Sequence, residues 1–176
     1  MTTSPTQKAR KTVTATISYS DLFGFIVDSF AIESLNYTIW EQRRVTDAHQ
    51  SFLALGTLSI KNVIDVARDI AGPEARLRGS AGDDVTIGDH RPPPGGPLVG
   101  SLLQDLLDRY NDPGPQDTDT SLHCDFERLH PFMDGNGRVG RLLWLWRRLH
   151  RGIPYSDLPL LQQFYYAVIA DSENPH

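Results

Sequence analysis

The twelve residues from His130 to Arg141, HPFMDGNGRVGR, decide how this chain is interpreted. Gly135 and Gly137 flank Asn136 at the point where an apolar helical pattern begins. Glycines there allow backbone angles that turn successive N–H groups toward one point, and a helix N-terminus attracts anions. The stretch therefore predicts a phosphate-binding loop that leads into a helix over 137–151.

Two arginines follow the loop one helical turn apart, at Arg138 and Arg141. Guanidinium groups at this spacing lie over the same helix end and can bind phosphate oxygens in pairs, which indicates a polyphosphate. At about 100° per residue, Arg138 shares a side with Leu142, Leu145 and Leu149, so it is predicted to face the interior. A buried arginine needs an anionic partner.

The same stretch contains an acid and a base. Asp134 is a suitable single protein ligand for Mg²⁺, which takes its other ligands from water and substrate phosphates. His130 has an ordinary pKa of about 6.5, so it is the natural general base at cellular pH. Together with the phosphate loop, these residues describe attack of a hydroxyl on a nucleotide phosphate.

Outside this stretch, the spacing of apolar residues predicts an all-α protein. We expect helices at about 19–34, within 40–70 as one helix or two joined near Gly56, and at about 99–110, 119–129 and 157–170. Gly152 and Pro154 end the helix that follows the phosphate loop. The back of that helix carries Arg147, Arg148 and Arg151, which are predicted to be solvent-exposed.

One long segment does not fit a helix. Five glycines and five prolines lie in the segment from Pro73 to Pro97, and both residue types interrupt regular helices. Within the segment, only Asp84 to Gly88 (DVTIG) could form a short strand or hairpin arm. Long loops in compact domains are often functional, so this edge is a candidate binding surface.

The composition of the chain argues for a globular protein and against a nucleic-acid-binding or membrane-spanning one. The chain has 176 residues, 39% of them hydrophobic and 22% charged, which predicts one globular domain over 17–176 after a flexible N-terminal arm, 1–16. A net charge of −5 argues against a general nucleic-acid binder. No apolar run approaches the roughly 20 residues of a membrane span. The polar N-terminus and the single Cys124 make the cytoplasm the expected location.

The stretch 130–141 resembles the Fic (filamentation induced by cAMP) motif, HPFx(D/E)GNGRxxR, at every specified position. The resemblance extends more loosely over about 26–154, through Ser29, Arg78, Val85, Ile87, the prolines at 92–94, His123, Phe126 and Glu127. It implies a compact helical bundle with a β-hairpin flap at about 79–97. It also implies adenylylation of a Ser, Thr or Tyr hydroxyl on a target protein, with ATP and Mg²⁺ as requirements and pyrophosphate as the product.

The resemblance also implies a role for each residue of the site. His130 would deprotonate the target hydroxyl, and Asp134 would hold Mg²⁺. The phosphates would be cradled by Gly135, Asn136 and Gly137 and oriented by Arg138 and Arg141. The target backbone would pair with the flap residues Asp84, Val85, Thr86, Ile87 and Gly88. The GNGR form of the motif favours transfer of AMP.

Many members of the family carry an inhibitory helix with the pattern (S/T)xxxE(G/N). Residues 29–34, SFAIES, fit it except at Ser34, which makes 19–34 a predicted inhibitory helix. Ser29 would belong to it, and Glu33 would pair with Arg141 in competition with the γ-phosphate. A glutamate near a helix end is also commonly just solvated. In related enzymes the same glutamate can support AMP removal, so the net direction of the reaction stays open.

Other interpretations remain for these residues. The chain could instead remove AMP, transfer another nucleotide such as UMP, or bind nucleotide without catalysis; its oligomeric state is open. The stretch 130–141 could also be a glycine-rich helix start whose arginines pair with nearby acids. His123 is expected to be a histidine of the core or next to the site, Glu127 a structural acid, and Trp146 a core residue.

Overall fold

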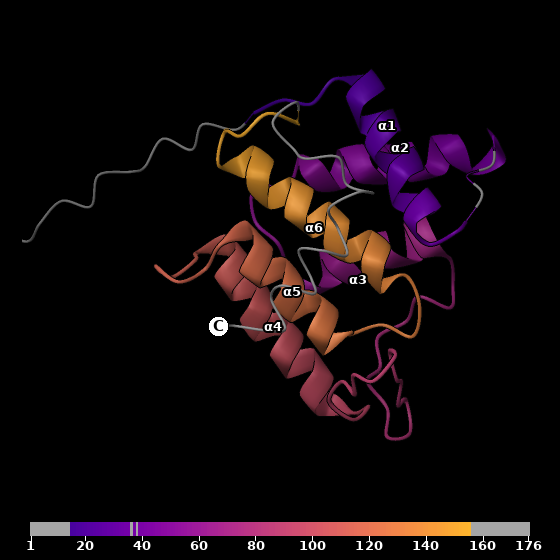
Figure 1. Ribbon diagram of the computed structural model, residues 1–176, viewed down its shortest axis with the longest axis vertical. Helices are drawn as coiled ribbons and strands as arrows, with labels where there is room; N and C mark the ends of the chain where they lie inside the picture. The colour runs from indigo at the N-terminus through magenta and orange to yellow at the C-terminus, as the bar shows by residue number, and fades with distance from the viewer. Residues whose placement is uncertain (1–14, 36, 38, 156–176) are drawn as a thin grey trace, which may run out of the picture.

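The computed structural model describes residues 15–155 apart from 36 and 38, and this part of the chain is a bundle of helices (Figure 1). The helices are α1 (Tyr19–Ile32), α2 (Ile39–Leu53), α3 (Ile60–Ala71), α4 (Pro97–Asn111), α5 (Asp119–Leu129) and α6 (Asn136–His150). The all-α prediction is confirmed, and the pattern at 40–70 proves to be two helices. The predicted helix at 157–170 and residues 1–14 of the predicted arm lie outside the described residues. None of the described helices is long and apolar enough to cross a membrane.

Helix starts follow from local sequence. Ser59 and Thr118 each accept a hydrogen bond from the backbone N–H three residues later and complete a capping box, with Asn62 and Ser121 respectively. Such caps satisfy N–H groups that have no partner within the helix. Gly72 ends α3 with φ 89°, a left-handed angle that favours glycine.

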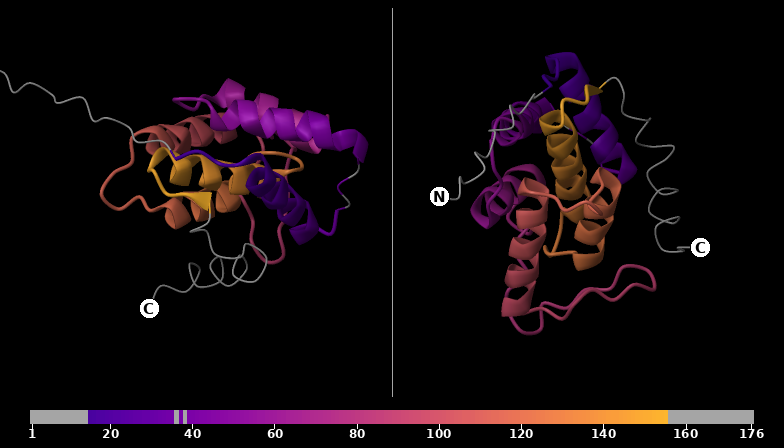
Figure 2. Two further views of the ribbon diagram at one scale, coloured as in Figure 1. Left: turned by 90° about the horizontal axis from the view of Figure 1, so that it is seen from above. Right: turned by 90° about the vertical axis from the view of Figure 1, so that its left-hand side faces the viewer.

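Helix α6 runs through the middle of the bundle and packs against α5, α3, α2 and α1 (Figures 1 and 2). Its buried apolar residues include Val139, Leu142, Leu145 and Leu149. Trp146 is buried as predicted, and its indole N–H donates to the Leu55 carbonyl at 2.9 Å. The N-terminus of α6 is consequently fixed by core packing on several sides.

The prediction of an exposed arginine face at the end of α6 was wrong for Arg147 and Arg148, whereas Arg151 is exposed as predicted. The side chains of Arg147 and Arg148 are only 14% and 18% exposed. Both arginines, together with Arg151, surround the buried carboxylate of Asp119 at distances of 3.8, 3.9 and 2.7 Å. Helix α5 begins at Asp119 and covers this side of α6, which a projection of α6 alone does not reveal.

The segment between α3 and α4 projects from the bundle as a loop folded back on itself (Figure 2, right). The expected strand at 84–88 is absent; Ile87 and His90 instead form an isolated bridge with reciprocal N–H to carbonyl bonds of 3.0 and 2.9 Å. Gly88 and Asp89 make the turn between them, with Gly88 at φ 55°. Pro92, Pro93 and Pro94 have no backbone N–H to donate to a ladder, and glycine weakens a strand interior, so a longer hairpin is not favoured.

Candidate active site

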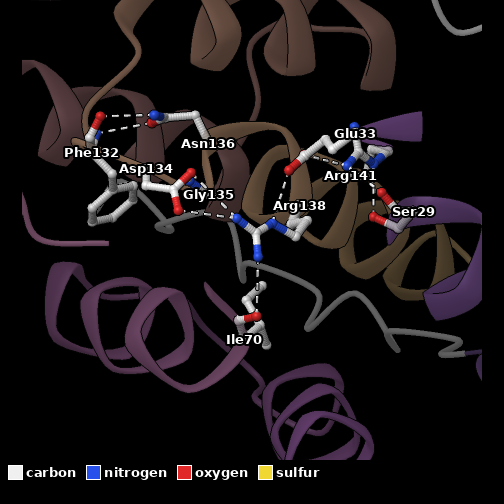
Figure 3. A network of polar contacts seen from close by, with 9 residues as sticks. All are labelled: Ser29, Glu33, Ile70, Phe132, Asp134, Gly135, Asn136, Arg138 and Arg141. Carbon is white, nitrogen blue, oxygen red and sulfur yellow. Dashed lines mark hydrogen bonds and ion pairs between the residues drawn. The ribbon is translucent and has the colours of Figure 1, made fainter. Parts of the chain in front are cut away.

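The loop before α6 is held by one amide side chain. Asn136 Oδ1 accepts from the Phe132 N–H at 2.9 Å, and Asn136 Nδ2 donates to the Phe132 carbonyl at 2.8 Å (Figure 3). Gly135 precedes the helix with φ 78°, and a Cβ there would lie 2.5 Å from the Ala71 Cβ. The amide side chain of Asn136 thus shapes the loop, and the phosphate contact predicted for this residue would be made by its backbone N–H.

His130 ends α5 in a left-handed conformation, φ 46°. Burial lowers the pKa of its imidazole to about 4, against an opposing effect of the Glu127 backbone. The positive charge of Arg78 and the neighbouring His90 also lower this pKa, and Asp134 raises it. The ring is therefore neutral near pH 7, which is the form a general base requires.

Asp134 lies beside the N-terminus of α6, with its side chain 53% exposed. Its Oδ1 accepts from the Gly135 N–H at 2.6 Å, and each of its two carboxylate oxygens lies 3.3 Å from Arg138 Nη2. An exposed carboxylate next to an anion-binding loop fits Mg²⁺ that takes further ligands from water and phosphate. In residues 15–155 without 36 and 38, no three His, Cys, Asp or Glu side chains gather around a metal-sized site.

Glu33 brings the two arginines of the motif together (Figure 3). Its Oε2 lies 2.9 Å from Arg138 Nε, and its Oε1 accepts from Arg141 Nη2 at 2.6 Å. Both arginines are buried, with side chains 7% and 1% exposed, whereas Glu33 is 24% exposed. The predicted pairing of Glu33 with Arg141 is present, and the inward orientation predicted for Arg138 is as expected.

Ser29 lies one turn before Glu33 on α1 and also binds Arg141. Its Oγ accepts from Arg141 Nε at 2.8 Å, and its carbonyl accepts from Nη2 at 2.7 Å. Gly137 lies directly beneath the glutamate, since a Cβ at this position would meet Glu33 Oε1 at 2.5 Å. The carboxylate of Glu33 therefore occupies the space over the first turn of α6, where the sequence predicts phosphate.

Two residues near the motif serve the packing of α5 against α6. His123 is 4% exposed, and burial lowers its pKa to about 4. Its Nε2 lies 3.9 Å from Glu127 Oε1. Both agree with the structural roles expected from the sequence.

Arg78 is the residue whose position the sequence did not explain. It is fully buried, and its guanidinium donates to four backbone carbonyls around His130 and the projecting loop. Every residue has a backbone carbonyl, so the sequence does not show which carbonyls Arg78 binds. Only the folded structure identifies these contacts.

Comparisons with known proteins show which family this chain is similar to. The model of the Fic/DOC family matches residues 57–146. The chain is 26% identical over 148 residues to a protein adenylyltransferase Fic of Drosophila ananassae, covering 80% of this chain and 29% of that relative. It thus spans less than a third of the curated relative's length.

Solved structures share the fold. A Fic-1 fragment from C. elegans superposes with a TM-score of 0.64 at 22% identity, over 88% of this chain and 56% of the fragment. A Fic family protein from Desulfovibrio desulfuricans gives a TM-score of 0.55 at 20% identity, over 87% of this chain and 57% of that one. With the family model covering residues 57–146 and the motif arranged around the start of α6, this chain belongs to the Fic/DOC family.

Proposed function

We propose that this protein is an adenylyltransferase that moves AMP from ATP to a hydroxyl side chain of a target protein. The observation that carries the proposal is the juxtaposition of a neutral His130, the exposed carboxylate of Asp134 and two arginines at one helix N-terminus. Positioning and charge stabilisation of this kind account for most catalysis of phosphate transfer.

The reaction balances with these groups. The target hydroxyl oxygen attacks the α-phosphorus, its proton passes to His130, and the bond between the α-phosphorus and the bridging oxygen breaks to release pyrophosphate. Arg138 and Arg141 bind the β- and γ-phosphates together with the N–H groups of Asn136 and Gly137, because the Gly135 N–H donates to Asp134. Asp134 would hold Mg²⁺ together with phosphate oxygens, and the ion would supply further charge neutralisation.

Glu33 makes the resting enzyme weakly active. Its carboxylate pairs with both arginines at 2.9 and 2.6 Å, so the γ-phosphate must compete with it. Hydrogen bonds to charged groups contribute about 1.5–3 kcal/mol each. Removing the carboxylate should then raise activity by about 10- to 100-fold.

The projecting loop supplies the docking edge for the target. Ile87 on this loop is 38% exposed. At the base of the loop, Arg78 donates a hydrogen bond to the His130 carbonyl, which ties the loop to the backbone of the base. The residues Asp84 to Gly88 would pair with an extended target segment, which gives affinity through main-chain hydrogen bonds.

Labelled ATP tests the proposal. With Mg²⁺ and a cell lysate, the Glu33→Gly and Glu33→Gln variants should transfer labelled AMP to proteins faster than the wild type. Asp28→Asn, which changes a carboxylate elsewhere on α1, is the matched control and should behave as wild type. His130→Ala in the Glu33→Gly background should abolish labelling.

If no variant labels any protein in several lysates, the result counts against adenylyl transfer. Use of labelled UTP in preference to ATP would identify a different nucleotidyl transfer. Release of AMP from prelabelled proteins by the wild type, at a rate above its labelling, would make AMP removal the net reaction.

A further inference from the structure

Arg78 lies at the base of the loop between α3 and α4 with its side chain fully buried. Its guanidinium donates four hydrogen bonds, all to backbone carbonyls. The acceptors and distances are His130 at 2.6 Å and Leu129, Asp83 and Pro93 at 3.0 Å each. Burying a guanidinium is costly, and this one is compensated by carbonyl dipoles.

Two of the four carbonyls belong to the end of α5. The last carbonyls of a helix lack partners within the helix, and a cation there is favourable. His130 follows in a left-handed conformation, φ 46°, which is strained for a residue with a Cβ. By holding the His130 carbonyl, Arg78 fixes this conformation and with it the direction in which the imidazole leaves the backbone.

The other two carbonyls belong to opposite arms of the projecting loop, at Asp83 and Pro93. The main chain of Arg78 adds further links, because its N–H donates to the Pro131 carbonyl at 2.9 Å and its carbonyl accepts from the Gly96 N–H at 3.0 Å. One residue therefore ties both arms of the loop to the backbone around His130.

We propose that Arg78 is a positioning residue that fixes the projecting loop, residues 79–97, relative to His130. A target hydroxyl that binds at the loop is then placed next to the imidazole that accepts its proton. The inference rests on the proposed adenylyl transfer. It assigns Arg78 no contact with nucleotide, whose site lies at residues 135–141. Loss of Arg78 should slow transfer and leave the affinity for ATP nearly unchanged.

Two substitutions test the role of Arg78 in the Glu33→Gly background. Arg78→Met removes all four side-chain donors, and Arg78→Lys keeps the charge but cannot span four carbonyls with a planar fork. Arg68→Met is the matched control, because Arg68 is an exposed arginine in the last turn of α3 and lies outside the loop 79–97. Each protein is studied well below its unfolding midpoint, measured by circular dichroism.

Labelling of lysate proteins with ATP should fall by about 10²-fold in Arg78→Met, the scale of a misplacement of about 1 Å, and by less in Arg78→Lys. The dissociation constant of MgATP, measured by calorimetry, should change by less than about twofold. Arg68→Met should match its parent. Unchanged labelling in Arg78→Met, or equal losses of labelling and of MgATP affinity, would overturn the proposal.

Hydrogen exchange tests the coupling without any activity. Peptides covering 79–97 and 128–133 should both exchange faster in Arg78→Lys, and neither should in Arg68→Met. Faster exchange in only one of the two peptides refutes the coupling. If the Glu33→Gly protein labels no target, but both peptides exchange faster when Arg78 is replaced, adenylyl transfer is rejected and the link between the loop and His130 is supported.

Discussion

At the residue scale, Ser34 determines how the helix that carries Glu33 ends. The Ser34 N–H donates to the Ala31 carbonyl at 3.0 Å and the Leu35 N–H to the Phe30 carbonyl at 3.1 Å, which is the Schellman arrangement. The arrangement requires a left-handed residue at Ser34, where φ is 57°. Glycine adopts this angle freely, whereas serine is strained by about 1 kcal/mol. The one mismatch to the inhibitory pattern therefore falls on a strained position.

Ser34→Gly should accordingly strengthen inhibition. Relief of about 1 kcal/mol of strain favours the conformation in which Glu33 reaches the arginines, so labelling by the otherwise wild-type protein should fall about fivefold. The same substitution combined with Glu33→Gly should have no such effect, since no carboxylate remains to be positioned. Equal effects in both backgrounds would show that Ser34 does not act through Glu33.

At the scale of elements, the approach of α5 to α6 sets the distance between the base and the phosphate loop. Gly140 permits this approach, because a Cβ there would lie 2.3 Å from Glu127 Oε1 and 3.0 Å from Phe126 Cδ1. His130 ends α5, and the anion-binding loop begins α6. A side chain at Gly140 would therefore displace the Glu127 carboxylate and press against Phe126 on α5.

Two alanine substitutions should have opposite effects on stability. Gly140→Ala should lower the free energy of unfolding by about 1–3 kcal/mol through overpacking. Gly24→Ala lies in α1, where a Cβ meets nothing within 4 Å, and should raise it by about 0.5–1 kcal/mol through helix propensity. Urea unfolding measures both, and a stabilised Gly140→Ala would contradict the close packing of α5 on α6.

At the scale of the whole molecule, buried histidines make the fold sensitive to acid. His49 and His123 are 1% and 4% exposed, and burial lowers the pKa of each to about 4. His49 Nδ1 donates to the Val45 carbonyl, while His123 is near the positive charge of Arg141, which lowers its pKa further. Both rings are therefore neutral in the folded protein near pH 5, although the unfolded chain would protonate them.

Stability should consequently decrease as the pH falls from about 6.5 toward 4. In this window the unfolded state binds more protons. His130, whose pKa is also lowered to about 4, adds to His49 and His123, and the three histidines give a slope of up to about 4.1 kcal/mol per pH unit. Above pH 7 both states are neutral, and these residues add no pH dependence. Urea unfolding of the wild type and of His49→Gln as a function of pH measures the slope, which should decrease by about a third in the variant. If the slope is equal in the two proteins, His49 does not contribute to the pH dependence of the free energy of unfolding.

The local sequence determined much of this protein. Residues 130–141 were sufficient to locate the anion-binding loop, the imidazole and the carboxylate beside it, and the apolar spacing gave the helices within 19–150. These features depend on neighbours within one or two turns, so their physical causes are present in the linear order of residue types.

Only the tertiary structure decided the rest. The contact of Glu33 with Arg138 joins residues that the pattern did not pair, the bonds of Arg78 go to carbonyls that carry no side-chain signal, and the cluster around Asp119 reverses the expected exposure of Arg147. Arg141 and Ser29 are 112 positions apart in the chain. The burial, charge balance and partners of such groups depend on which helices pack together, and no local periodicity specifies that.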